Sequence, residues 1–321
     1  MGSVVLSKGA VAVHTSRQMV FFANGLQHDR GLARLLDRQR PVNILFLTSV
    51  RDTGTCDRNG LLVNTRGGPR YMEGVIERTV RKTFSGQILE HHARVVGVIT
   101  DDREHDMRES DYPVRPHEGR PWIFPHDLMT PDGERLIDRT VHIPSDFRGL
   151  PIGAVDERQT SKLAFEQAVY EQMRSRGADI LVSDHYMARI EFLIGPTLGL
   201  FGKVLNIHPA VTLKDHPFCF RGPTPTKDAI LRAQTGVNVK TGATLHVVNP
   251  TIDDGPPLAY IGATPVYRDD EPQWLRWRNY QHAKLPLFIA GLMHYLTSIY
   301  PYLGRIDVAR LHEARAPRSV R

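Results

Sequence analysis

The stretch Val204-Leu205-Asn206-Ile207-His208-Pro209 combines an apolar run, two polar side chains and a proline that ends the run. Alternate residues of an extended strand project to the same face, so Asn206 and His208 are predicted to lie side by side. Open α/β sheets bind their ligands at the carboxyl ends of the strands, which is where these two residues stand. We therefore expect a functional site at this strand end.

A second polar segment, Thr251-Ile252-Asp253-Asp254-Gly255-Pro256, follows another apolar run at residues 244–248. This order predicts that its carboxylates reach the same edge of the sheet. An amide, an imidazole and a carboxylate can together perform acyl transfer. The amide holds the developing oxyanion, the imidazole moves protons, and the carboxylate orients the imidazole or takes the proton. Asn206, His208 and Asp253 are the candidate catalytic residues.

The surrounding pattern predicts an α/β fold, with a Rossmann-like, mostly parallel sheet and helices on both faces. Continuous apolar runs of strand length alternate with segments of helical periodicity, as expected for buried parallel strands. The expected strands cover residues 42–48, 94–100, 179–183, 203–207, 242–248 and 258–266, and the expected helices cover 71–84, 161–176 (stopped by Gly177), 226–234 and 272–300. Residues 189–193 are expected to begin a turn or a helix.

Three segments are expected along the chain. Residues 1–41 form an N-terminal extension with a short amphipathic helix at 31–36, residues 42–270 form the catalytic domain, and residues 271–321 form a C-terminal helical extension. Residues 103–155 are rich in Pro, Arg, Asp and His, with short apolar islands such as Trp122-Ile123-Phe124. Their apolar content is too thin for a core of their own, so they are predicted to be an insertion.

Composition excludes several classes of protein. The 321 residues carry a net charge of +6, but the basic residues are spread along the chain, which disfavours nucleic-acid binding. The two cysteines and fifteen histidines lack the spacing of a disulfide framework or a metal site, so no metal is expected. Neither a membrane-spanning apolar run nor a signal-peptide pattern is found, which predicts a cytoplasmic protein without membrane contacts.

A polar loop at residues 51–60 follows the first strand of the predicted sheet. It lacks the G-x-G-x-x-G pattern of a dinucleotide site. Its charged and amide side chains suit an anionic or zwitterionic substrate, and the alternative that it is an ordinary surface loop stays open. The candidate substrate-binding residues are Arg51, Asp52, Arg58 and Asn59, together with Arg221 from the loop that follows His208.

The motifs Asn206-Ile207-His208-Pro209 and Ile252-Asp253-Asp254-Gly255-Pro256 resemble the signature of 10-formyltetrahydrofolate-dependent formyltransferases, of the type that acts on glycinamide ribonucleotide. The resemblance extends back through residues 179–190 and covers roughly residues 160–266. It implies that Asn206 binds the formyl oxygen, that His208 assists proton transfer and that Asp253 is the essential carboxylate. Asp254 stands where many relatives have glycine.

The same resemblance implies a co-substrate, 10-formyltetrahydrofolate, and no metal. Backbone at residues 187–190 and 249–253 is expected to line the pterin pocket. The implied cofactor-binding residues are Met187, Ala188, Arg189, Ile190, Asn249 and Ile252.

The acceptor of the formyl group is less defined. The short Gly/Ser/Asn phosphate loop of the glycinamide ribonucleotide enzymes is replaced here by residues 51–60, and too few residues follow Asp253 for the C-terminal barrel of methionyl-tRNA formyltransferases. The long loop and the insertion resemble the hydroxyornithine formyltransferases of siderophore biosynthesis. We expect N5-hydroxyornithine as the acceptor. An amino sugar, another amine, or hydrolysis of the folate by water are the alternatives, and the oligomeric state is left open.

Overall fold

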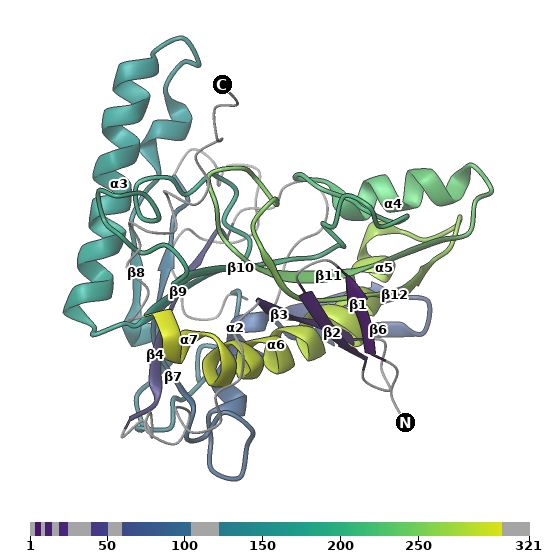
Figure 1. The fold of residues 1–321 in the computed structure, drawn as a ribbon, viewed down its shortest axis with the longest axis horizontal. Coiled ribbons are helices and arrows are strands. Elements are labelled where there is room, and N and C mark those ends of the chain that lie inside the picture. Colours follow the sequence, from purple (N-terminus) through teal and green to yellow (C-terminus); the bar gives the residue numbers. More distant parts are fainter. Residues whose placement is uncertain are drawn as a thin grey trace.

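The computed structural model describes residues 4–7, 10–14, 19–24, 40–50, 60–103 and 122–303 (Figure 1). One large sheet runs through this part of the chain, and helices cover both of its faces. A separate hairpin is formed by β5 (Leu61–Thr65) and β6 (Gly68–Met72).

The centre of the large sheet is parallel. Its strands follow the order β10-β9-β4-β7-β8, and each strand is parallel to the next. Their bounds are β4 Val42–Thr48, β7 Ala93–Thr100, β8 Thr140–His142, β9 Ile180–Ser183 and β10 Val204–His208. The predictions for residues 42–48, 94–100, 179–183 and 203–207 are therefore confirmed to within one residue.

Beyond β10 the sheet is antiparallel. The next strands are β11, β12, β3, β2 and β1, with bounds Val239–Val247, Pro257–Val266, Met19–Asn24, Ala10–His14 and Val4–Ser7. Strands β11 and β12 were predicted, whereas the three strands from the expected N-terminal extension were not. Their sequences do not alternate apolar and polar side chains, so this signal of a strand is absent from them. The helix expected at residues 31–36 lies outside the described residues.

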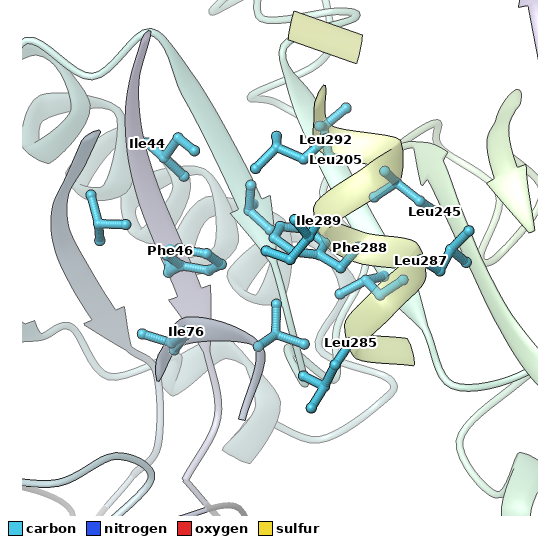
Figure 2. Close-up of a cluster of buried hydrophobic side chains, with 14 of the residues drawn as sticks. Ile44, Phe46, Ile76, Leu205, Leu245, Leu285, Leu287, Phe288, Ile289 and Leu292 are labelled. Carbon is cyan, nitrogen blue, oxygen red and sulfur yellow. The ribbon is translucent and has the colours of Figure 1, made fainter. Parts of the chain in front are cut away.

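Each central strand divides its side chains between two cores, as alternation requires. In β4, Ile44 and Phe46 enter one core, while Leu45 and Leu47 enter the other. Figure 2 shows the first core, where Ile44 and Phe46 face the helix α6 (Leu285–Ser298). The helix α2 (Val75–Lys82) packs in the same core, and α3 (Val155–Ser175) covers the opposite face. The α/β class and the helices on both faces are thus confirmed.

Several predicted helix bounds are corrected. The helix expected at residues 71–84 is shorter because its first residues belong to β6. The helix α3 begins at Val155 rather than at residue 161, and it ends before Gly177, whose φ of 59° terminates it. The helix expected at residues 272–300 is divided into α5 (Pro272–Asn279), the π-helical turn η4 (Tyr280–Lys284) and α6.

Short elements complete the described chain. They are η2 Leu136–Arg139, η3 Asp146–Gly149, α4 Pro225–Gln234 and α7 Tyr300–Leu303. In the expected insertion, Trp122 and Phe124 are buried in the first core, so the described part of that segment packs into the main body. In the segment 189–193, residues 189–191 are irregular and residues 192–193 belong to a turn. Within the described ranges, no helix has both the length and the apolar character that a membrane span requires.

Candidate active site

Strand β10 places two polar side chains at its carboxyl end. Asn206 and His208 alternate with Leu205 and Ile207, which are buried in the first core. The alternation of a strand therefore holds the amide and the imidazole on the opposite side from these apolar anchors. Both side chains line one cleft, with a volume of about 260 Å³.

His208 contacts Asp253, which comes from the loop after β11. The His208 Nδ1 atom lies 3.3 Å from Asp253 Oδ1. Both residues are buried: His208 is 6% exposed and Asp253 is 9% exposed. The other ring nitrogen, Nε2, donates to the Phe220 carbonyl at 3.1 Å. Because both ring nitrogens face oxygen acceptors, this position suits an imidazole that takes up a second proton.

The Asp253 carboxylate is held ionised. Burial acts to raise its pKa, but the hydrogen bond and charge of His208 and the Gly222 N–H outweigh burial and lower the pKa to about 2. The Gly222 N–H donates to Asp253 Oδ2 at 3.0 Å. Asp253 has a left-handed backbone, with φ of 53°, a conformation that Asp and Asn adopt more readily than most residues. This turn directs the carboxylate toward His208.

His246 is a site residue that the sequence analysis missed. It is the direct cross-strand partner of Asn206 between β10 and β11, and its Nε2 atom lies 3.0 Å from Asn206 Nδ2. Burial lowers the pKa of His246 to about 4, although the Val247 carbonyl and Asp253 act to raise it. The neutral ring donates from Nδ1 to the Val247 carbonyl at 3.1 Å. Nε2 therefore accepts a hydrogen bond from the Asn206 amide and fixes its orientation.

A histidine between the apolar residues Leu245 and Val247 was the available signal for His246. It lies in the run at residues 244–248, seven positions before Asp253. The contact with Asn206 depends on the register of two antiparallel strands, which the sequence does not specify. Gly255 packs against His246 and Val247, since a Cβ atom there would lie 1.7 Å from the Val247 carbonyl oxygen and 2.9 Å from His246 Nδ1.

The segments expected to bind the cofactor line the same cleft. Met187, Ala188, Arg189 and Ile190 follow β9, and Asn249 and Ile252 follow β11. The first segment is anchored by Glu166 of α3, which is fully buried. Its carboxylate accepts from the Glu191 N–H at 3.1 Å and from the Leu193 N–H at 2.8 Å. This buried contact fixes the loop that forms one wall of the cleft.

The second segment is held by its own side chains. Asn249 accepts from the Thr251 N–H at 3.1 Å and donates to the Asp254 carbonyl at 3.1 Å. The Asp254 carboxylate pairs with Arg221 at 2.7 Å and with Lys214 at 3.1 Å. Arg221, expected to bind substrate, also donates to the Thr212 carbonyl, so its guanidinium stabilises this loop beside the cleft.

The remaining expected substrate-binding residues, Arg51, Asp52, Arg58 and Asn59, lie outside the described residues. Two residues that the sequence analysis did not single out also line the cleft: the partly buried His185 and the buried Lys284. Within the described part of the chain, no group of three or more His, Cys, Asp or Glu side chains could hold a metal ion.

Comparison with known proteins identifies relatives of this chain. Residues 138–287 match the family described as formyl transferase. A segment of 130 residues is 36% identical to the phosphoribosylglycinamide formyltransferase of Bacillus subtilis (strain 168). That segment is 39% of this chain and 56% of the relative, so the match spans little more than half of that enzyme.

Solved structures extend the likeness. PvdF, described as an N10-formyltetrahydrofolate-dependent formyltransferase of pyoverdin biosynthesis, aligns with a TM-score of 0.70 and 28% identity over 79% of this chain and 99% of PvdF. Glycinamide ribonucleotide transformylase 1 from Symbiobacterium toebii aligns with a TM-score of 0.50 and 20% identity over 81% of this chain and 89% of that one, a likeness of fold alone. Residues 138–287 are thus similar in sequence to the formyl transferase family, and the chain shares its fold with PvdF.

Proposed function

We propose that the protein transfers the formyl group of 10-formyltetrahydrofolate to the hydroxylamine nitrogen of N5-hydroxyornithine, a step of hydroxamate siderophore biosynthesis. The observation that carries the proposal is the convergence of Asn206, His208 and Asp253 in one cleft that the expected folate-binding segments also line. Formyl transfer agrees with the formyl transferase family that residues 138–287 match. The choice of acceptor draws on the likeness to PvdF, which extends over 99% of that protein.

In the proposed reaction, the acceptor nitrogen attacks the formyl carbon of the folate. The carbonyl oxygen gains negative charge, which the Asn206 amide stabilises. His246 engages one N–H of this amide, which leaves the other N–H for the oxyanion. A donor in such a position is typically worth ~3 kcal/mol in the barrier.

The proton balance assigns different roles to His208 and Asp253. The attacking nitrogen loses one proton, and the folate N10 gains one when its bond to the formyl carbon breaks. Asp253 is a weak base because its pKa is about 2, so it serves to orient His208 and to stabilise the protonated imidazole. His208 then carries the proton from the acceptor to N10, directly or through water.

The hydroxylamine is a suitable nucleophile. An ordinary alkyl ammonium of the lysine type has a pKa of ~10.4 and is charged at neutral pH, so it has no lone pair for attack. An N-hydroxylated amine is far less basic and is neutral at the same pH. No strong base is then needed beside the acceptor, in agreement with a site whose carboxylate has low proton affinity.

An acceptor screen with 10-formyltetrahydrofolate tests the proposal. The acceptors are N5-hydroxyornithine, ornithine, an amino sugar and none, and both tetrahydrofolate and formate are measured. We expect tetrahydrofolate formation to require N5-hydroxyornithine, with little formate released. Acceptor-independent release of formate would replace the proposal with hydrolysis, and faster transfer to the amino sugar would replace the acceptor.

A further inference from the structure

A group of polar side chains, mostly buried and here called the basal cluster, borders the cleft that the candidate catalytic residues line. It consists of Asp184, His185, Arg276, Tyr280 and Lys284. Asp184 and His185 directly follow β9, and the other three residues are spaced four apart along α5 and η4. Only His185 and Lys284 of this cluster line the cleft.

The bonds of Tyr280 determine which ring nitrogen of His185 carries the proton. The Tyr280 hydroxyl accepts from Lys284 Nζ at 2.9 Å and from Arg276 Nη2 at 2.9 Å, because both cations can only donate. Its own proton is left for His185 Nε2, at 2.6 Å. Arg276 Nη2 also lies 2.8 Å from that nitrogen, so His185 Nε2 is an acceptor.

His185 consequently presents an N–H group at Nδ1. Burial lowers the pKa of His185 to about 4, with a further lowering by the charge of Lys284, so the ring carries one proton at neutral pH. With Nε2 as the acceptor, this proton resides on Nδ1. Within the described part of the chain, Nδ1 makes no hydrogen bond, and the residue lines the cleft.

Lys284 supplies a second donor and a positive charge. Its ammonium donates to Asp184 Oδ1 at 2.7 Å and to Tyr280, which uses two of its three N–H groups. The residue is only 1% exposed yet lines the cleft. Arg276 adds a second positive charge behind Tyr280, against the single negative charge of Asp184. The wall of the cleft that His185 and Lys284 form therefore offers hydrogen-bond donors and a positive potential to a ligand.

The two faces of the sheet separate this wall from the expected folate pocket. Tyr280 and Ala283 are buried in the first core, together with α6. Ile190 and Tyr186, in the expected folate-lining segment, are buried in the second core, with α3. The cleft is thus lined by residues from both sides of the strand edge, and Asn206 and His208 line the same cleft.

We infer that the basal cluster binds the α-carboxylate of the amine acceptor through Lys284 Nζ and His185 Nδ1, and so selects an amino-acid acceptor. This inference rests on the proposed function, because it assigns the acceptor to the wall opposite the folate. Two donors match the two oxygens of a carboxylate. A phosphate group has three oxygens and more negative charge, and would need more donors than this wall provides.

Substrate truncation tests the contact. Initial rates are measured with N5-hydroxyornithine, with its decarboxylated analogue N-hydroxy-1,4-diaminobutane, and with the analogue that carries a phosphonate instead of the carboxylate. The variant Lys284→Gln should raise KM for N5-hydroxyornithine by about 30-fold, because a hydrogen bond between charged groups is lost. It should leave KM for the decarboxylated analogue and for the folate unchanged. Lys82→Gln, on the far helix α2, is the control.

Folding of the variant is checked by thermal unfolding, because Lys284→Gln leaves Asp184 buried without its counter-ion. The double variant Asp184→Asn/Lys284→Gln removes both charges and should show the same selective loss. An equal rise in KM for N5-hydroxyornithine and for its decarboxylated analogue would overturn the contact between Lys284 and the α-carboxylate. It would leave the proposed formyl transfer intact. A lower KM for the phosphonate would reassign the wall to phosphate. Absence of transfer to every hydroxylamine would overturn the proposed function and, with it, the inference.

Discussion

Replacing Asp253 by Asn tests the central contact of the site with minimal change of shape. The new side chain keeps the size of the old one and tolerates the left-handed backbone at φ of 53°. It removes the negative charge beside His208 Nδ1, 3.3 Å away. Because the protonated imidazole then lacks its counter-charge, we expect kcat for formyl transfer to fall by about 10³-fold or more.

The same change has a stability effect with a defined pH dependence. In the folded protein the pKa of Asp253 is about 2, below its usual 3.8, so the ionised carboxylate stabilises the fold at neutral pH. The difference corresponds to about 2.5 kcal/mol. This contribution is complete above pH ~4 and is lost as the pH falls from about 4 to about 2. The variant should therefore be less stable by up to about 2 kcal/mol at neutral pH, and the gap should narrow below pH ~4.

The assays are tetrahydrofolate formation under saturating acceptor and urea unfolding at several pH values. Asp254→Asn is the control, because its carboxylate pairs with Arg221 and Lys214 instead of His208. It should keep its rate within about threefold, as expected for a partly exposed ion pair. Full activity of Asp253→Asn, or a stability difference independent of pH, would refute the role assigned to this carboxylate.

Further predictions concern the supports of the site and the core. His246→Leu should lower kcat by about 10- to 100-fold with little change in KM for the folate, since the Asn206 amide loses its orientation; an unchanged kcat would contradict this role. Glu166→Gln should raise KM for the folate about fivefold, since one buried hydrogen bond to the loop is weakened, and an effect on the acceptor KM alone would count against it. Phe288→Ala should lower the free energy of unfolding by about 3–5 kcal/mol in urea titrations, and a loss below 1 kcal/mol would show that the cavity collapses. Burial lowers the pKa of His185 and of His246 to about 4, so their protonation in the unfolded chain should reduce stability by about 2 kcal/mol each between pH 6.5 and pH 5. A free energy of unfolding that does not change over this pH interval would exclude the lowered pKa values of these two histidines.

The sheet and the two polar strand ends could be predicted because they depend on local pattern. A continuous apolar run, as in residues 42–48, has few structural solutions other than a strand buried on both faces. The alternation of Asn206 and His208 with apolar neighbours likewise fixes their shared face. Both features are set within a few residues of chain.

Features that depend on distant pairing could not be predicted. His246 meets Asn206 through the register of β10 and β11, and no local pattern encodes that register. Tyr280 packs in the first core, yet its hydroxyl also bonds to Lys284 and His185. The spacing of four residues between Arg276, Tyr280 and Lys284 was visible in the sequence. The sequence does not show, however, that α5 and η4 place these three side chains against Asp184 and His185 at the end of β9.

The pairing of β3 with β12 has a practical consequence for anyone who shortens this chain. The backbone of β12 is bonded on one side by β11 and on the other by β3, so its N–H and C=O groups have partners along both sides where these strands overlap. Removing residues 1–24 would leave those groups on β12 open to water and to any extended segment nearby, including a strand from another molecule. A truncated protein would thus be prone to associate edge to edge, although its catalytic residues were untouched.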